Sequence, residues 1–300
     1  MKTILIAGAS GFVGQYLSRA MIAQGHRVTG LGTSKTHPME KENDWFTWVC
    51  ADTTTQGDWQ DHVSTADVII NLAGRSIFKP WTKSYKQAIR DSRILTTQNL
   101  VNALPDAWQG HLISTSAVGY YGDRAETVLT EADPGGQDFL AQVCKEWEAQ
   151  ALKAEDKGAK VCLMRFGVVL GHGGALDVMG RAFKFFMGGP LGSGNHWFPW
   201  IHIQDIARAV DFILAKGLDG AFNFTGPEPI RQKDFARALG KALHRPAITP
   251  APAFMVKLVM GELGASLLQS QQAFPRALEN KGFSFAHKTA AKALEAIYSD

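Results

Sequence analysis

The chain has 300 residues, of which 45% are hydrophobic and 20% charged, with a formal net charge of +3 at pH 7. This composition is ordinary for a globular protein, and the absence of a basic run argues against a nucleic-acid partner. No apolar run approaches the ~20 residues that cross a bilayer, so we expect no membrane partner. The cysteines Cys50, Cys144 and Cys162 are widely spaced, which favours reduced thiols in a cytoplasmic protein over disulfides or a metal site.

Short apolar runs alternate with amphipathic segments through most of the chain. The apolar runs predict strands at 4–7, 26–31, 46–51, 66–73, 111–117 and 220–226, and a strand leading into a loop at 159–171. Helical periodicity predicts helices at 12–24, 85–104 and 138–158, and a short strand followed by a helix within 201–217. Strands that alternate with helices predict an α/β fold, a Rossmann-type doubly wound parallel sheet.

The pattern of residues changes after Gly171. We expect residues 1–225 to form a Rossmann domain, with a lobe-linking insert at about 171–200 that is rich in glycine and aromatic residues. Residues 226–300 contain helical stretches, turns and prolines, which predicts a small, mostly helical C-terminal lobe that covers the substrate. The segment HWFPW at 196–200 either closes a pocket over the cofactor or forms core between the lobes.

A glycine-rich turn, GASGFVG at 8–14, joins the first strand to the first helix. Gly8 permits a tight turn, Gly11 lets the backbone approach a pyrophosphate, and Gly14 lets helix and strand pack closely. The first N–H groups of a helix have no intrahelical partner and attract phosphate. We therefore expect a dinucleotide at this turn. The residues expected to bind it are Gly8, Ser10, Gly11, Phe12, Val13 and Gly14.

The end of the second strand indicates which dinucleotide binds. A carboxylate there would accept a hydrogen bond from the ribose 2′-hydroxyl and repel a 2′-phosphate. The segment 26–37 contains no Asp or Glu, and it offers Thr33, Ser34 and Lys35 as phosphate donors. NADP(H) is therefore favoured over NAD(H). Asp52, after the third strand, either accepts a hydrogen bond from the adenine amino group or caps a helix.

Several motifs lie in an order that resembles the extended short-chain dehydrogenases/reductases. The glycine turn, NLAG at 71–74, ISTSAVGYYG at 113–122 and WIHIQDIARAV at 200–210 each resemble an element of that family. The resemblance implies that Leu72, Ala73 and Gly74 line the cofactor. It also implies a dimer of two identical chains, built on the helices at 85–104 and 138–158.

A narrower resemblance spans nearly the whole chain. The segments PWTKSYKQAIRDSRILTTQNLV at 80–101 and GGPLGSGNHWFPWIHIQD at 188–205 are similar to an atypical epimerase-like subfamily of unknown substrate. The tail from about residue 248 resembles the short C-terminal domain of undefined function that characterises this subfamily.

The catalytic pair implied by the wider family is missing. Its active members carry Tyr-x-x-x-Lys on one helix, where the lysine lowers the tyrosine pKa and the tyrosine exchanges a proton with the substrate. The corresponding segment, DFLAQVCKEWE at 138–148, contains no tyrosine. Either Leu140 and Cys144 or Ala141 and Lys145 occupy the two places, depending on the alignment.

Three residues near the end of the fifth predicted strand remain as candidate catalytic groups: Ser116, Tyr120 and Tyr121. The resemblance aligns Ser116 with the family's active-site serine. For both tyrosines, packing beneath the cofactor is favoured over proton transfer, because a tyrosine without a neighbouring cation is a poor acid. Cys144 lacks a matching His or Asn arrangement, and we expect a buried, unreactive thiol.

Two further groups of polar residues have alternative interpretations. Arg75, Lys79, Arg90 and Arg93 either bind an anionic substrate or form a solvated helix face. His202 and Asp205 are too few for a metal site, and we expect them to act as structural hydrogen-bond partners. The sequence therefore predicts an NADP(H)-dependent oxidoreductase or epimerase-like protein acting on a small molecule. The alternative is a non-catalytic NADP(H) sensor.

Overall fold

The computed structural model describes residues 1–299. Its centre is a seven-stranded parallel sheet with the strand order β11-β7-β5-β4-β1-β2-β3. The strands are β1 (Thr3–Ala7), β2 (Arg27–Gly32), β3 (Phe46–Cys50), β4 (Val68–Asn71), β5 (His111–Ala117), β7 (Lys160–Phe166) and β11 (Gly220–Phe224). The predicted Rossmann-type fold is confirmed.

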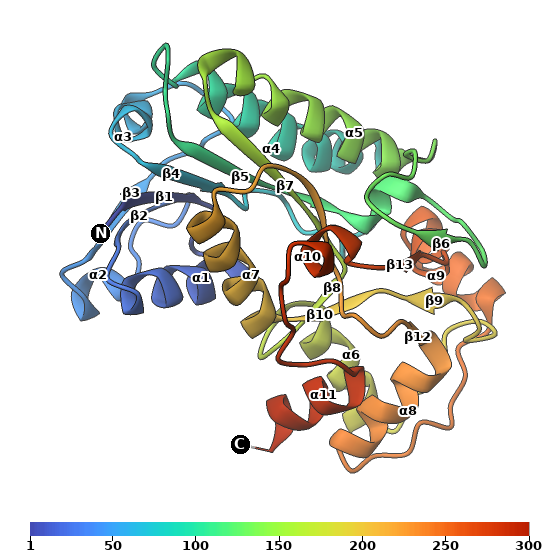
Figure 1. Ribbon diagram of the computed structural model, residues 1–300. Coiled ribbons are helices and arrows are strands. Elements are labelled where there is room, and N and C mark those ends of the chain that lie inside the picture. The colour runs from blue at the N-terminus through green and yellow to red at the C-terminus, as the bar shows by residue number, and fades with distance from the viewer. Residues whose placement is uncertain (300) are drawn as a thin grey trace.

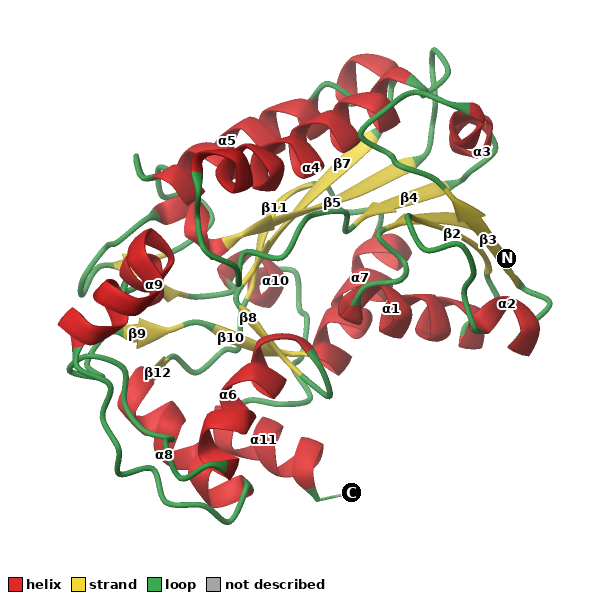
Figure 2. Ribbon diagram, turned by 180° about the vertical axis from the view of Figure 1, so that it is seen from behind, coloured by secondary structure: helices red, strands yellow, loops and turns green. Residues whose placement is uncertain are grey.

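Helices cover both faces of the sheet (Figure 1). On one face lie α1 (Phe12–Ala23) and α7 (Ile203–Lys216), and on the other α4 (Lys83–Asn102) and α5 (Phe139–Leu152), which pack side by side (Figure 2). Short helices, α2 (Met39–Glu42), η1 (Asp58–Gln60) and α3 (Asp61–Ser64), connect the first strands. Because helices cover both faces of the sheet, the side chains on both sides of a strand are buried. Every residue of β4 is buried in this way, which explains its continuous apolar run. Among helices within residues 1–299, none has the length and apolar character to cross a membrane.

The direction of the chain connections reverses at β1. This strand pairs with β2 on one side and with β4 on the other. The chain after β1 therefore leads to α1 on one face of the sheet, and the chain after β4 leads to α4 on the other face (Figure 1). We refer to the carboxyl edge of the sheet at this point as the crevice. In open parallel sheets this is the place where nucleotides bind.

The predicted elements at 159–171 and 138–158 differ from the structure in where they end. The segment 159–171 was predicted as a strand leading into a loop; it forms β7 and, after Gly167, the separate strand β8 (Val168–Leu170). The N–H of Val168 donates to Pro199, and β8 leaves the large sheet to pair with β10 (Trp200–His202). The predicted helix at 138–158 ends at Leu152, and η3 (Glu155–Lys157) continues to Gly158, whose φ is +89°.

A mostly helical lobe packs beyond the carboxyl edge of the sheet (Figure 2). Its helices are α6 (Gly174–Lys184), α8 (Gln232–Ala242), α9 (Ala253–Leu267), α10 (Arg276–Asn280) and α11 (Ala290–Tyr298). Its short strands are β9 (Trp197–Phe198), β12 (Ile230–Arg231), and the pair β6 (Val128–Leu129) and β13 (Gln272–Ala273).

The core of this lobe draws on residues from both sides of position 225. Trp200 is 1% exposed and belongs to one hydrophobic cluster with Phe235 and Leu294, against which Phe198 packs. The HWFPW segment therefore contributes Phe198 and Trp200 to core between the lobes, one of its two predicted roles. Conversely, Phe283 lies after position 225 but packs in the core of the large sheet. The predicted boundary at 225 and 226 stays a prediction.

Candidate functional site

The three glycines of the turn after β1 meet different steric demands. Gly8 has a φ of +80°, and a Cβ there would lie 2.9 Å from the carbonyl carbon of Leu72. A Cβ on Gly14 would lie 2.7 Å from the Cα of Ala9, so this glycine lets α1 approach the turn. A Cβ on Gly11 would have a single neighbour, the Gly8 oxygen at 3.2 Å. Gly11 therefore leaves room for a group from outside the chain.

The amino end of α1 has the features of an anion-binding site. The N–H groups of Gly8 and Ala9 both donate to the Leu31 carbonyl, at 2.9 and 3.2 Å. Gly11 caps the helix in an extended conformation, with no side-chain cap and no acidic residue in the first turn. The N–H groups of Phe12 and Val13 begin the helix, where no intrahelical acceptor exists. A diphosphate fits this end of the helix.

An unsatisfied hydroxyl lies at the same edge of the sheet. Oγ1 of Thr115, near the carboxyl end of β5, is buried and has no hydrogen-bond partner within residues 1–299. Buried polar groups are nearly always paired. The orphaned Thr115 hydroxyl is therefore a second feature that suits a polar ligand at this edge.

The side chains of Thr33, Ser34 and Lys35 are exposed at the end of β2. The loop that carries them is held by its backbone, because Nε1 of Trp48 donates to the Ser34 carbonyl at 2.9 Å. The hydroxyls and the ammonium group consequently remain available at the crevice.

Asp52 is exposed and closes a turn after β3. Its Oδ1 accepts hydrogen bonds from the hydroxyl and the N–H of Thr54, at 2.6 and 3.0 Å. These bonds lower the pKa of the Asp52 carboxyl. The carboxylate is thus held at the crevice rim by the turn, and a contact with adenine stays a prediction.

The predicted cofactor residues after β4 lie directly beside the glycine turn. The N–H of Leu72 donates to Ala7 at 2.9 Å, and the N–H of Ala73 donates to Oδ1 of Asn71 at 3.2 Å. Gly74 lies against the guanidinium of Arg93, since a Cβ on Gly74 would be 3.0 Å from its Cζ. The structure therefore brings the predicted residues after β1 and β4 together.

The geometry of α5 shows which residues stand at the places of the missing pair. A Cβ on Gly119 would lie 3.6 Å from Cβ of Leu140. Cys144 is buried beside Ser116, and burial raises the pKa of its thiol to about 11. Lys145 instead packs against Gly135. Leu140 and Cys144 thus face the carboxyl end of β5, where neither donates a proton at neutral pH.

A buried polar network, which the sequence did not reveal, engages Ser116. Its Oγ donates to Oε1 of Glu148 at 2.6 Å. The two Glu148 oxygens also accept from Nε and Nη2 of Arg165, each at 2.9 Å. All three residues are buried, with at most 6% of the residue surface exposed. The only signal of this network in the sequence was the opposite charge of two residues, Glu148 in the segment that forms α5 and Arg165 in the segment that forms β7.

The two candidate tyrosines extend this network. The Tyr121 hydroxyl donates to Oδ1 of Asn223 at 2.7 Å and accepts from Nη1 of Arg165 at 3.0 Å. Burial raises the pKa of Tyr121 to about 12. The Arg165 guanidinium lies 3.6 Å from the centroid of the Tyr120 ring. These contacts support packing roles for both rings, the alternative left open by the sequence.

The four candidate anion-binding cations differ in their surroundings. Nη2 of Arg90 lies 2.6 Å from a Glu146 oxygen, and Nζ of Lys79 lies 5.9 Å from the Tyr85 ring centroid. Arg75 is exposed. Arg93 is half-buried and forms no ion pair within residues 1–299.

His202 and Asp205 act as structural hydrogen-bond partners, as predicted. Asp205 is 1% exposed and accepts from the N–H groups of Ala286 and His287, at 2.8 and 3.0 Å. Nδ1 of His202 accepts from the N–H of Gln204 at 3.2 Å and caps α7. Residues 1–299 bring together no group of three or more His, Cys, Asp or Glu that could hold a metal ion.

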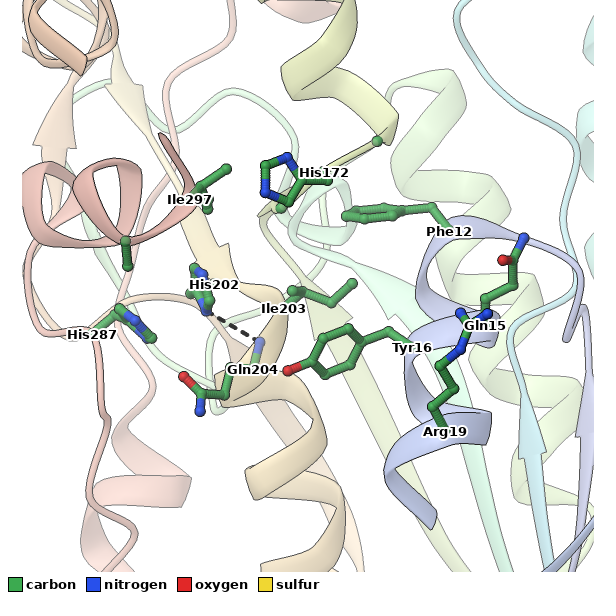
Figure 3. Close-up of a pocket in the computed structure, with 13 residues that line it drawn as sticks. Phe12, Gln15, Tyr16, Arg19, His172, His202, Ile203, Gln204, His287 and Ile297 are labelled. Carbon is green, nitrogen blue, oxygen red and sulfur yellow. Dashed lines mark hydrogen bonds between the residues drawn. The ribbon is translucent and has the colours of Figure 1, made fainter. Parts of the chain in front are cut away.

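A cavity of about 600 Å³ lies beside α1, between this helix, the start of α7 and the C-terminal lobe (Figure 3). It is lined by the outward face of α1, including Phe12 and Tyr16, and by His172, His202 and His287. The opposite face of α1 packs on the sheet. Phe12 is the one predicted cofactor residue in its lining, so this cavity adjoins the crevice without coinciding with it.

Comparisons with known proteins agree with this arrangement. Residues 4–224 match the NAD dependent epimerase/dehydratase family, and residues 251–297 match a domain of unknown function, DUF1731. The chloroplastic epimerase family protein SDR39U1 homolog of Arabidopsis thaliana is 38% identical over 98% of this chain and 86% of its own length. Epimerase family protein YfhF of Bacillus subtilis is 33% identical over 99% of this chain and 98% of its own.

Solved structures show the same fold. The human epimerase family protein SDR39U1 (isoform 2), crystallised with NADPH, superposes with a TM-score of 0.85 at 28% identity, covering 99% of both chains. The UDP-glucuronic acid 4-epimerase of Bacillus cereus, in complex with UDP-glucuronic acid and NAD, has a TM-score of 0.78 at 18% identity, covering 99% of this chain and 98% of its own. The second similarity is one of fold alone.

Proposed function

Because this chain belongs to the NAD dependent epimerase/dehydratase family, we propose that it is an NADP(H)-dependent oxidoreductase or epimerase-like enzyme acting on a small molecule. The predicted family, with its short C-terminal domain of undefined function, is confirmed by the two family matches. The observation that carries the proposal is the uncapped amino end of α1, which Gly11 leaves open to a diphosphate.

NADP(H) is the cofactor that these residues suit. No carboxylate stands at the end of β2, and Lys35 is available there for a 2′-phosphate. The human relative was crystallised with NADPH, which supports the same choice. When bound, NADP(H) supplies a hydride donor or acceptor. The chain's own residues hold its diphosphate at α1 and its nucleoside end at Thr33, Ser34 and Lys35.

The proton in this proposal comes from water in the crevice. Ser116 and Tyr121 are held in the buried network of Glu148 and Arg165, and their hydrogen bonds fix the end of β5. The Tyr120 ring packs on Arg165. Ser116, Tyr120 and Tyr121 therefore serve as positioning residues, and none of them replaces the family tyrosine.

Exposing the protein to NADPH and a library of small carbonyl compounds tests the proposal. Oxidation of NADPH, followed by its absorbance, by any member of the library supports an oxidoreductase. Tight NADPH binding without turnover of any compound would contradict it.

A non-catalytic NADP(H) sensor is the second candidate. The observation that favours it is the pair Leu140 and Cys144, which faces the end of β5 where an acid and a cation are needed. A sensor binds NADPH and NADP⁺ with different affinities and changes its shape on binding. Equal affinities for the two forms, together with turnover, would exclude it.

A further inference from the structure

The cleft beside β5 lacks the positive charge that a lysine on α5 would bring. Cys144 faces this place instead, and Lys145 packs elsewhere against Gly135. A cation reaches the same region from the neighbouring helix, α4. The Arg93 guanidinium lies over the ring of Trp147, which follows Cys144 by one helical turn on α5. Arg93 therefore lies beside the part of α5 that carries Cys144.

Arg93 is held rigidly by uncharged groups. Its Nη1 donates to the Ile89 carbonyl at 2.9 Å, and its Cζ lies 5.2 Å from the centroid of the Trp147 ring. Its guanidinium lies against Gly74, where a Cβ would be 3.0 to 3.3 Å from Cζ, Nη2 and Nε. Because Gly74 has no side chain, the Arg93 guanidinium can lie beside the loop after β4.

The positive charge of Arg93 is not balanced by a carboxylate within residues 1–299. Guanidinium groups stay protonated in proteins, and a half-buried one without an anion loses hydration. Burial accordingly lowers the pKa of Arg93. Within residues 1–299 no carboxylate lies within 4.0 Å of it. Arg90, one helical turn earlier, differs because it pairs with Glu146 and Asp91. The contrast indicates that the partner of Arg93 is a ligand.

We propose that Arg93 is the anion-binding residue of the substrate cleft, and that the substrate carries a carboxylate which pairs with its guanidinium. The proposal rests on the proposed function, since it places the substrate beside bound NADP(H). A carboxylate is favoured over a phosphate because its single charge matches one cation and its two oxygens match the planar guanidinium fork.

The test uses the full chain saturated with NADPH and titrated calorimetrically with malonate and, separately, with inorganic phosphate. NADPH affinity is measured first for every variant, so that failure of cofactor binding in the parent is seen as failure of the proposed function itself. We expect malonate to bind the parent protein more tightly than phosphate. Arg93→Gln should weaken malonate binding at least tenfold, with the NADPH dissociation constant unchanged within twofold.

Arg93→Lys and Arg90→Gln serve as matched variants. The lysine variant keeps the charge without the fork, and it should bind malonate with intermediate affinity, which covers the case in which Arg93→Gln does not fold. Arg90→Gln, on the same helix, should bind malonate like the parent. Equal malonate affinity in Arg93→Gln and the parent, no malonate binding to the parent, or tighter binding of phosphate would overturn the proposal. A tenfold loss of NADPH affinity in Arg93→Gln would also overturn it, because Arg93 would then serve the cofactor.

Discussion

The hydroxyl of Ser116 donates a 2.6 Å hydrogen bond to a carboxylate oxygen of Glu148. Ser116 is the penultimate residue of β5 and Glu148 lies on α5, so the bond ties the strand to the helix at the carboxyl edge of the sheet. The same carboxylate is paired with Arg165 on β7. A serine that would otherwise face a substrate is thus part of the scaffold of the crevice.

Removing the Glu148 carboxylate should destabilise the protein strongly. Glu148→Ala leaves the buried Arg165 guanidinium without its partner, and breaking a buried pair in this way costs about 3–5 kcal/mol. The free energy of unfolding, measured by urea denaturation, checks the loss. Glu146→Ala is the matched control on the same helix, because its partly exposed pair with Arg90 should contribute less than about 1 kcal/mol. Losses of equal size would show that the network is not structural.

The hydroxyl of Tyr121 should matter for stability and not for cofactor binding. Tyr121→Phe leaves Oδ1 of Asn223 and Nη1 of Arg165 each one hydrogen bond short, which costs about 1–3 kcal/mol. Thermal unfolding measures the loss, and fluorescence titration measures the NADPH dissociation constant. A variant of parental stability that has lost turnover would instead identify Tyr121 as a catalytic residue.

Lys35 should decide between the two nicotinamide cofactors. Lys35→Ala removes the one cation at the exposed loop 33–35 and should weaken NADPH binding about tenfold, which corresponds to about 1.4 kcal/mol. The affinity for NADH, which lacks the 2′-phosphate, should remain unchanged. Parallel titrations with both cofactors check this, and an equal loss for both would contradict the assignment.

The protein should lose stability as the pH falls from about 6.5 to 4. Burial, assisted by His287, lowers the pKa of His202 to about 4, with Asp205 acting in the opposite direction. The folded state keeps His202 neutral while the unfolded state binds a proton, so the stability present above pH 6.5 is lost towards pH 4. His111, whose pKa burial lowers to about 4, contributes in the same sense.

His202→Asn isolates one of these contributions. Asparagine retains an acceptor for the N–H of Gln204 at the start of α7 but does not titrate. The variant should show a smaller fall in unfolding free energy between pH 6.5 and 4 than the parent, measured by urea denaturation at each pH. A fall of parental size would show that His202 is not responsible.

The fold was predictable because short sequence patterns, such as apolar runs and the glycine turn, indicate its strands and turns. The apolar run of β4 is buried on both faces, and Gly8 and Gly14 of the first turn occupy the places where side chains would collide. The division of β7 from β8 was not predictable, because the apolar run continues through Gly167. It arises from pairing with β10, some 30 residues along the chain.

The residues expected at the cofactor edge come together in the structure, whereas the network at the catalytic end was not expected. Gly8 and Leu72 follow neighbouring strands of the sheet, and the glycine motif and the family resemblance assigned both to the cofactor before the structure was known. The network of Ser116, Glu148 and Arg165 joins a helix to two strands, and it depends on side-chain directions that no spacing encodes. The contacts of Arg93 with Trp147 and Gly74, which leave it half-buried, also depend on side-chain directions.

A fluorescence titration of NADPH into the parent protein and into Gly11→Val tests the central claim most directly. An added Cβ at Gly11 would meet only the Gly8 oxygen, at 3.2 Å, and the branched side chain would occupy the amino end of α1, where we place the diphosphate. We expect the parent to bind NADPH, and Gly11→Val to keep the parental circular dichroism spectrum while losing at least a hundredfold in affinity. Parental affinity in the variant, or no binding by the parent, would contradict the account.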